Sequence, residues 1–283
     1  MNAPAAPALM SIDVEDWFHV ANLEPVVPRE TWGERESRVE RNTDRMLELL
    51  AEHDAYCTCF VLGWVAERHP ALVRRIADGG HEIACHGYGH QLIPQLSEQE
   101  FREDVRRAKG LLEDLAGTAV RGYRAPSFSI TDWAIPILQD LGFSYDSSAF
   151  PTVAHDRYGN LAGVAAGTAL VELRPGFWEV SISCLMVGSR GLPWGGGGYF
   201  RLLPYGAFRR GIDRILRSGE PYVFYIHPWE IDPGQPRVEG LGALARFRHY
   251  VGLGRAESRL RSLLADFQWT GIADLLPSSS AAR

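Results

Sequence analysis

The chain has 283 residues, of which 46% are hydrophobic and 23% charged, which is ordinary for a globular protein and long enough for one large domain or two small ones. Its formal net charge is −6 and its basic residues are scattered among acids, so the chain lacks the positive field that a nucleic-acid partner requires. The sequence has no run of about 18 apolar residues, and its first ten residues lack the charged and apolar regions of a secretory signal. We therefore expect no transmembrane segment and a cytoplasmic location.

Short apolar runs alternate with helical patterns along the first half of the chain, beginning with an expected strand at 8–14 that ends in acids. Further strands are expected at 56–62, 81–85, 119–123 and 143–146, and helices at 38–52, 70–78, 97–115 and 131–141. This alternation predicts an α/β fold in which parallel strands are joined by helices. Because successive strands end close to polar residues, we expect a barrel-like sheet with its chemistry at the carboxyl ends of the strands.

The alternation stops after residue 146, where the pattern changes to an expected hairpin at 170–183 and a flexible loop at Gly195–Gly198. The remaining elements are expected helices at 205–217, 241–251 and 256–267, and strands at 222–226 and 268–272. No linker divides the chain convincingly. We therefore predict a single domain over residues 1–283, with a core at about 9–230 and a helical extension at about 231–276.

Two histidines, His86 and His90, lie four residues apart directly after an expected strand, so one short turn can aim both at one cation. A catalytic metal commonly has three protein ligands and an open position for water, so a third ligand must come from elsewhere. The end of the first strand offers Asp13, Glu15 and Asp16, whose burial without a cation or a proton would be costly. The alternative is a pair of ordinary loop histidines beside a solvated strand end, which is the better interpretation of an isolated pair but is weakened by the features below.

Two other positions could serve a reaction. His227 follows an apolar strand and precedes a proline, which is a suitable place for a proton donor but also a common one for a packed histidine. Arg124 follows another strand on a turn fixed by Pro126, where a partly buried guanidinium requires a carboxylate partner. Arg124 could either orient a catalytic aspartate or form a structural ion pair.

Together these segments resemble the polysaccharide deacetylases of the NodB-homology type, also called carbohydrate esterase family four, over residues 9–228. The runs Ser11–His19, Gly195–Tyr205 and His227–Pro233 resemble more narrowly the exosortase-associated branch, which is linked to exopolysaccharide production. The resemblance implies a distorted (β/α) barrel of about seven strand–helix units. It also implies a divalent metal, often zinc, and the removal of acetyl groups from the N-acetylated amino sugars of a polysaccharide.

The resemblance further implies a role for each matching residue. Asp13 matches the catalytic base of the family, and Arg124 matches the arginine that holds this base. His86 and His90 match the two metal-binding histidines. His227 matches the acid that protonates the leaving amine.

The first motif departs from the family pattern. Many relatives have two adjacent aspartates, the second of which binds the metal, whereas here Asp13 is followed by Val14, Glu15 and Asp16. Strand alternation places positions 13 and 15 on one face, which favours Glu15 as the carboxylate ligand. Asp16 is the alternative ligand if the strand ends at Val14.

Several aromatic residues are candidates for stacking on sugar rings, although most aromatic residues in a chain of this size belong to the core. They are Trp17, Tyr88, Trp178 and Tyr199. Two other functions are compatible with the sequence. The first is a hydrolase of small cyclic or linear amides on the same fold, and the second is a non-catalytic glycan-binding protein.

Overall fold

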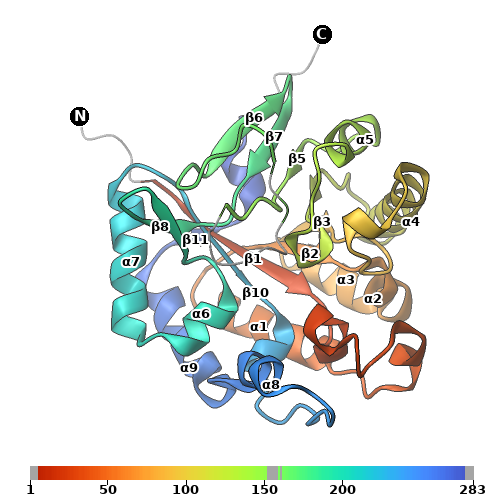
Figure 1. The fold of residues 1–283 in the computed structure, drawn as a ribbon, viewed down its shortest axis with the longest axis horizontal. Coiled ribbons are helices and arrows are strands. Elements are labelled where there is room, and N and C mark those ends of the chain that lie inside the picture. Colours follow the sequence, from red (N-terminus) through yellow and green to blue (C-terminus); the bar gives the residue numbers. More distant parts are fainter. Residues whose placement is uncertain (1–5, 152–158, 160, 278–283) are drawn as a thin grey trace.

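The computed structural model describes residues 6–151, 159 and 161–277 and shows a curled sheet with helices around it (Figure 1). In chain order the strands of this sheet are β1 (Ala8–Val14), β2 (Thr58–Val61), β3 (Glu82–Cys85), β4 (Gly122–Tyr123), β5 (Tyr145–Asp146), β6 (Leu170–Arg174), β7 (Phe177–Val180), β10 (Tyr222–Ile226) and β11 (Trp269–Thr270). Their order across the sheet is β10-β1-β2-β3-β4-β5-β7-β6, with β11 beside β1. Only β6 and β7 pair in antiparallel fashion among these described strands. The predicted distorted α/β barrel is confirmed.

The helices lie around the outside of the curled sheet (Figure 1). They are α1 (Val39–Ala51), α2 (Gly63–Arg68), α3 (Pro70–Asp78), α4 (Glu98–Ala116), α5 (Ala134–Asp140), α6 (Gly197–Leu202), α7 (Tyr205–Arg217), α8 (Ala243–Tyr250) and α9 (Leu253–Asp266). In α4, Ser97 and Glu100 form the expected capping box, and the buried residues Phe101, Val105 and Ala108 share one face. None of the helices in the described part of the chain is both long and apolar enough to span a lipid bilayer.

Strand β1 has both faces buried, and the two faces have different neighbours. Met10 and Ile12 belong to the large core between the sheet and the helices, whereas Leu9 belongs to a smaller cluster formed by residues from β2, β3 and β10 inside the curl. Side chains alternate along a strand, so Ser11 and Asp13 point to the inside together with Leu9. The carboxylate of Asp13 therefore lies inside the barrel, close to the carboxyl end of β1.

The segment between β7 and β10 connects the two edges of the curled sheet. It contains an antiparallel hairpin of β8 (Cys184–Val187) and β9 (Arg190–Pro193), which was not predicted. Ser183 N donates to Val223 O at 3.3 Å, and Tyr225 N donates to Gly195 O at 2.7 Å. The expectation of a flexible loop at Gly195–Gly198 is wrong, because this stretch bonds to β10 and begins α6.

The region between β1 and α1 has no predicted helix or strand. It contains three short 3-10 helices, η1 (Trp17–His19), η2 (Ala21–Leu23) and η3 (Arg29–Glu34). Its apolar residues follow neither a period of two nor a period of 3.6, because they converge on an aromatic cluster that includes Trp32 and the distant Trp229. Tertiary packing rather than local pattern therefore determines this region.

Trp194 packs against the backbone of α7 at Gly211, which gives a test of how the segment after β7 is held. The indole Nε1 of Trp194 donates to Phe208 O at 2.8 Å, and a Cβ at position 211 would lie 2.0 Å from Nε1. We expect Gly211→Ala to lower the free energy of unfolding in urea by about 1–3 kcal/mol. Gly206→Ala in the same helix meets no atom within 4 Å and should not lower it. Equal effects of the two substitutions would contradict this packing.

Candidate active site

Polar side chains gather where the parallel strands end. Glu15 directly follows β1, His86 follows β3, Arg124 follows β4 and His227 follows β10. These strands run parallel in one curled sheet, so their carboxyl ends meet at the same edge. Four segments that are far apart in the sequence therefore contribute to one site.

Glu15, His86 and His90 form a buried cluster with a donor set suited to a metal ion. Glu15 Oε1 lies 2.7 Å from His86 Nε2 and 3.0 Å from His90 Nε2. The ligand atoms of all three lie within 4.8 Å of one another. Burial alone would raise the pKa of Glu15, but the charges and hydrogen bonds of His90 and His86 hold it well below its ordinary value.

The hydrogen bonding of His86 shows why this cluster fits a cation. His86 Nδ1 lies 2.8 Å from the carbonyl oxygen of Arg124, which can only accept, so Nδ1 donates. A neutral His86 then presents the lone pair of Nε2 to the Glu15 carboxylate, and two acceptors at this distance need a cation or a proton between them. Two imidazole nitrogens and one carboxylate, with a second shell that fixes the imidazole, make up a donor set found at catalytic zinc sites.

Asp13 lies beside this cluster and is held by Arg124. Arg124 Nη1 donates to Asp13 Oδ1 at 2.6 Å and to Ser11 Oγ at 2.9 Å. Arg124 Nε and Nη2 donate to the carbonyl and the hydroxyl of Ser147, both at 2.9 Å, and the guanidinium lies 4.0 Å from the ring centre of Phe60. The arginine is therefore fixed on all sides, and it fixes one oxygen of Asp13.

His227 faces the other oxygen of Asp13, with its Nε2 3.8 Å from Asp13 Oδ2. His227 Nδ1 lies 2.9 Å from Glu230 Oε1, and Arg201 Nε donates to Glu230 Oε2 at 2.7 Å. Burial would lower the pKa of His227, but the hydrogen bond to Glu230 and the negative charges of Glu15, Glu230 and Asp13 raise it to about 9. Burial would likewise raise the pKa of Glu230, but Arg201 and His227 lower it to about 2. These contacts favour the protonated form of His227, which faces Asp13.

Asp16, the alternative carboxylate ligand, does not join the histidines. Its Oδ1 accepts from Trp17 N at 2.9 Å, and its Oδ2 accepts from Arg38 N at 2.7 Å and Val39 N at 3.1 Å. The Ser37 hydroxyl also donates to Oδ2, at 2.8 Å. Asp16 therefore caps η1 and joins this turn to the start of α1.

Of the four aromatic residues predicted to stack on sugar rings, Trp17 is buried in the cluster with Trp32, and the other three have different surroundings. The ring of Tyr88 is covered by the guanidinium of Arg107 at 3.5 Å, and its hydroxyl donates to Glu67 at 2.8 Å. Trp178 on β7 packs against the cluster inside the barrel, and Tyr199 on α6 packs against the large outer core. Their role in substrate binding stays a prediction.

Sequence reasoning assigned no role to several residues that complete the site. Ser11 and Ser147 bind Arg124, while Glu230 and Arg201 support His227. Glu230 carries a local signal, because it lies three residues after His227 in a turn that starts with proline. Arg201 carries no such signal, because 29 residues separate it from Glu230.

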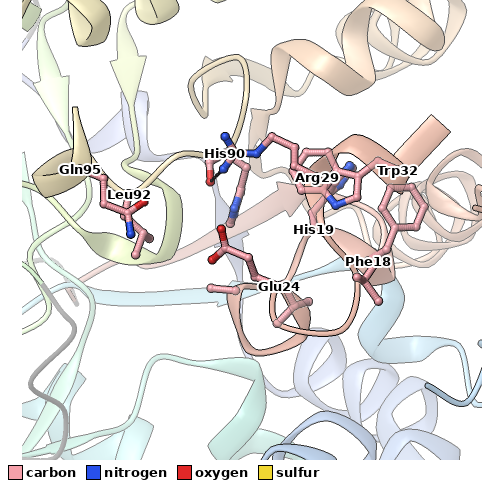
Figure 2. A pocket seen from close by; sticks show the side chains of 11 residues that line it. Phe18, His19, Glu24, Arg29, Trp32, His90, Leu92 and Gln95 are labelled. Atoms are coloured by element: carbon pink, nitrogen blue, oxygen red, sulfur yellow. Dashed lines mark hydrogen bonds between the residues drawn. The ribbon is translucent and has the colours of Figure 1, made fainter. Parts of the chain in front are cut away.

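A pocket adjoins the cluster of Glu15, His86 and His90 on the side of η1 and η3 (Figure 2). Its wall includes Phe18, His19, Trp32 and His90, and Arg29 reaches across it to donate to His90 O at 3.4 Å. His19 Nδ1 accepts from the backbone N–H of the helix cap at 2.9 Å, which leaves Nε2 to carry the proton of the neutral ring. Neither this nitrogen nor Trp32 Nε1 has a hydrogen-bond partner among the described residues. The wall next to His90 thus contains aromatic faces and buried N–H donors.

Comparison with known proteins connects this geometry to a family. Residues 33–145 match the family model described as polysaccharide deacetylase. These residues are a polysaccharide deacetylase domain. Residues 147–277 match a second family model, described as a domain of unknown function (DUF3473). The deacetylase match includes His86, His90 and Arg124, whereas His227 belongs to the second match.

Individual relatives agree with this domain assignment. A peptidoglycan-N-acetylglucosamine deacetylase of Bacillus cereus is 31% identical over 120 residues, which are 37% of this chain and 44% of the relative. A chitooligosaccharide deacetylase of Azorhizobium caulinodans is 28% identical over 101 residues, covering 35% of this chain and 48% of the relative. The matched stretch thus spans less than half the length of these curated relatives.

A solved structure of a candidate polysaccharide deacetylase from Mycobacterium smegmatis has the same fold. It superposes with a TM-score of 0.62 at 21% identity and covers 97% of this chain and 91% of its own. A CE4 family pseudoenzyme from Bacillus anthracis superposes with a TM-score of 0.52 at 16% identity, covering 98% of this chain and 67% of its own. The fold of both halves of the chain is therefore present in solved structures.

The different surroundings of Glu15 and Asp16 predict opposite effects of substituting them. Glu15→Gln should weaken zinc binding by more than about 100-fold, because a direct ligand contributes more than the outer-shell groups whose loss costs about 10–100-fold. Asp16→Ala should leave zinc affinity within a few-fold but lower the free energy of unfolding by about 2 kcal/mol, since a helix cap is lost. Competition with a chromogenic zinc chelator and urea unfolding measure the two effects. Loss of zinc affinity in Asp16→Ala without loss of stability would overturn this assignment.

Proposed function

We propose that the protein removes acetyl groups from N-acetylated amino sugars of a polysaccharide, with a divalent metal, zinc by its donor set, bound by Glu15, His86 and His90. One observation carries the proposal. Beside the proposed metal ligands, Asp13 Oδ2 and His227 Nε2 face each other at 3.8 Å. A base and an acid placed on one site are what amide hydrolysis requires.

The charge states of the two groups suit this reaction. Asp13 is held through one oxygen by Arg124, while its other oxygen faces His227 and can accept a proton from the attacking water. A bound divalent cation supplies Lewis acidity, which makes water a stronger acid and polarises a carbonyl. The water oxygen bonds to the acetyl carbon, and the bond from this carbon to nitrogen then breaks.

His227 completes the step. Its Nδ1 is engaged by Glu230, so its Nε2 is the nitrogen that faces Asp13 and donates a proton to the departing amine. The products are acetate and a free amino sugar, and before the next turnover Asp13 loses its proton to solvent and His227 regains one. The chain's own residues therefore account for both proton transfers.

The substrate class rests on the deacetylase domain at 33–145 and on the sugar polymers in the names of the curated relatives. A place in exopolysaccharide production rests on the resemblance of the runs at 11–19, 195–205 and 227–233 to the exosortase-associated branch.

Acetate release tests the function directly. The zinc-loaded protein should release acetate from N-acetylglucosamine oligomers, and chelation should abolish the release. Asp13→Asn should reduce kcat at least about 100-fold, because it removes the general base. Asp78→Asn, which changes an exposed aspartate at the end of α3, is the matched control and should leave kcat unchanged.

Other outcomes of this experiment would support one of the two alternative functions. Hydrolysis of cyclic amides without acetate release from oligomers would make the protein a small-amide hydrolase. Oligomer binding that is equal in the wild type and Asp13→Asn, with no hydrolysis of either substrate, would make it a glycan-binding protein. A protein that binds no divalent metal would overturn the mechanism.

The acid role of His227 predicts an alkaline limit to the reaction. The pKa of His227 is raised, so its protonated form is present below that pKa and is lost as pH rises through it. The raising groups are Glu230, Glu15 and Asp13, and a cation bound at Glu15 offsets part of this charge. The upper limb of kcat/KM should therefore lie between the ordinary histidine value of about 6.5 and a pKa of about 9. If the residual kcat/KM of His227→Gln falls at the same alkaline pH as that of the wild type, another group is the acid.

A further inference from the structure

The second half of the chain matches a domain of unknown function and contains the glycine run at 195–198. This run packs against Glu230, the carboxylate that contacts the proposed general acid His227. Gly197 is the first residue of α6, and a Cβ at this position would lie 2.2 Å from Glu230 Oε1 and 2.4 Å from Oε2. No side chain fits between this backbone and the carboxylate. Glycine here allows the close approach of α6 to Glu230.

Arg201 lies one helical turn after Gly197 and therefore on the same face of α6. Its Nε donates to Glu230 Oε2 at 2.7 Å, and only 2% of its side chain is exposed. Its Nη1 and Nη2 donate to the carbonyls of His249 at 3.1 Å and Arg248 at 3.2 Å, near the end of α8. The guanidinium thus connects Glu230 to the C-terminal helices.

Glu230 uses both of its oxygens. Oε2 binds Arg201, and Oε1 accepts from the backbone N–H of His227 at 3.1 Å and lies 2.9 Å from His227 Nδ1. An ionised carboxylate only accepts, so Nδ1 carries a proton and Nε2 is the atom that faces the reaction. The orientation of His227 therefore depends on where Glu230 is held.

We infer that Gly197, Arg201 and the end of α8 form a rigid cradle for Glu230, and that this cradle positions His227 to protonate the leaving amine. Arg201 is on this account a positioning residue for amide hydrolysis, and the function of the 147–277 region includes the supply and alignment of the general acid. The inference rests on the proposed function for its kinetic consequence, but the geometry of His227 can be tested without turnover.

The leaving group separates this role from a purely structural one. An amine nitrogen must gain a proton as its bond to the acetyl carbon breaks, whereas a nitrophenolate oxygen leaves without one. Misplacing His227 should therefore impair hydrolysis of an N-acetyl sugar far more than hydrolysis of 4-nitrophenyl acetate. General damage to the site would reduce both activities together.

The substitutions are chosen to change the cradle with little loss of volume. Arg201→Lys keeps the positive charge but removes the planar fork, and Glu230→Gln keeps the shape but removes the negative charge. Arg259→Met is the matched control. Arg259 Nη1 also binds α6, since it donates to the carbonyls of Phe200 at 2.8 Å and Arg201 at 2.7 Å. It has no described contact with Glu230.

In the full-length zinc-loaded protein, Arg201→Lys and Glu230→Gln should lower kcat for N-acetylglucosamine oligomers by about 10–100-fold. Hydrolysis of 4-nitrophenyl acetate should stay within about 3-fold of the wild type. Arg259→Met should leave the ratio of the two activities unchanged, whatever its effect on melting temperature. A parallel fall of both activities in Arg201→Lys, or an unchanged ratio, would overturn the positioning role.

Nitrogen-15 NMR of the imidazole of His227 in the metal-free protein provides the second measurement. The wild type should show Nδ1 protonated throughout the titration, and Arg201→Lys and Glu230→Gln should each shift the tautomer balance or the titration midpoint. Unchanged spectra in both variants would overturn the inference. If the wild type hydrolyses no N-acetyl sugar while these spectra change, the cradle stands and the proposed substrate fails.

Discussion

The guanidinium of Arg124 lies fully buried inside the barrel and connects strands that are not neighbours. Arg124 follows β4, whereas its partner Asp13 is on β1, and β2 and β3 lie between them in the sheet. The side chain reaches Asp13 because the sheet curls, and it passes over the ring of Phe60 on β2. Burying such a pair is costly unless every donor is satisfied, and Ser11 and Ser147 provide the remaining acceptors. The position of Asp13 therefore depends on the curl of the sheet, because only the curl brings Arg124 within reach of it.

A second buried arginine has a corresponding role on the other side of the site. Arg201 holds Glu230 as Arg124 holds Asp13, and Glu230 in turn holds His227. The deacetylase match begins at residue 33 and ends at 145, so Asp13, the proposed base, lies before it and His227, the proposed acid, lies after it. The matched part contributes His86, His90 and Arg124, and the first strand and the second half of the chain contribute the other residues of the site.

Local signals in the sequence were sufficient for many of the regular elements, but not for α2, α6, β8 or β9. The strand at 8–14 and the helices at 70–78 and 205–217 have the predicted bounds, because their apolar periods and end residues agree. Strand alternation favoured Glu15 over Asp16, and Glu15 does lie beside His86 and His90, although β1 ends at Val14 and Glu15 follows it in a turn. The prediction of a flexible loop at 195–198 was wrong, because Gly195, Gly196 and Gly197 lie against Val223, Tyr225 and Glu230, which are far along the chain. Contacts between distant residues, such as Arg201 with Glu230, leave no pattern in a single sequence.

The two arginine–carboxylate pairs also explain how Asp13 and His227, the proposed base and acid, coexist 3.8 Å apart. Burial by itself favours the neutral forms of a carboxyl group and an imidazole, and a proton moved from His227 to Asp13 would produce a pair unable to catalyse hydrolysis. Here the charges alternate along Arg124, Asp13, His227, Glu230 and Arg201, so each ionised group lies between groups of opposite sign or beside one. Removing either terminal arginine leaves a buried carboxylate without its cation. The charge state needed for catalysis is therefore a property of the whole row, to which the first strand, the deacetylase domain and the second half of the chain each contribute.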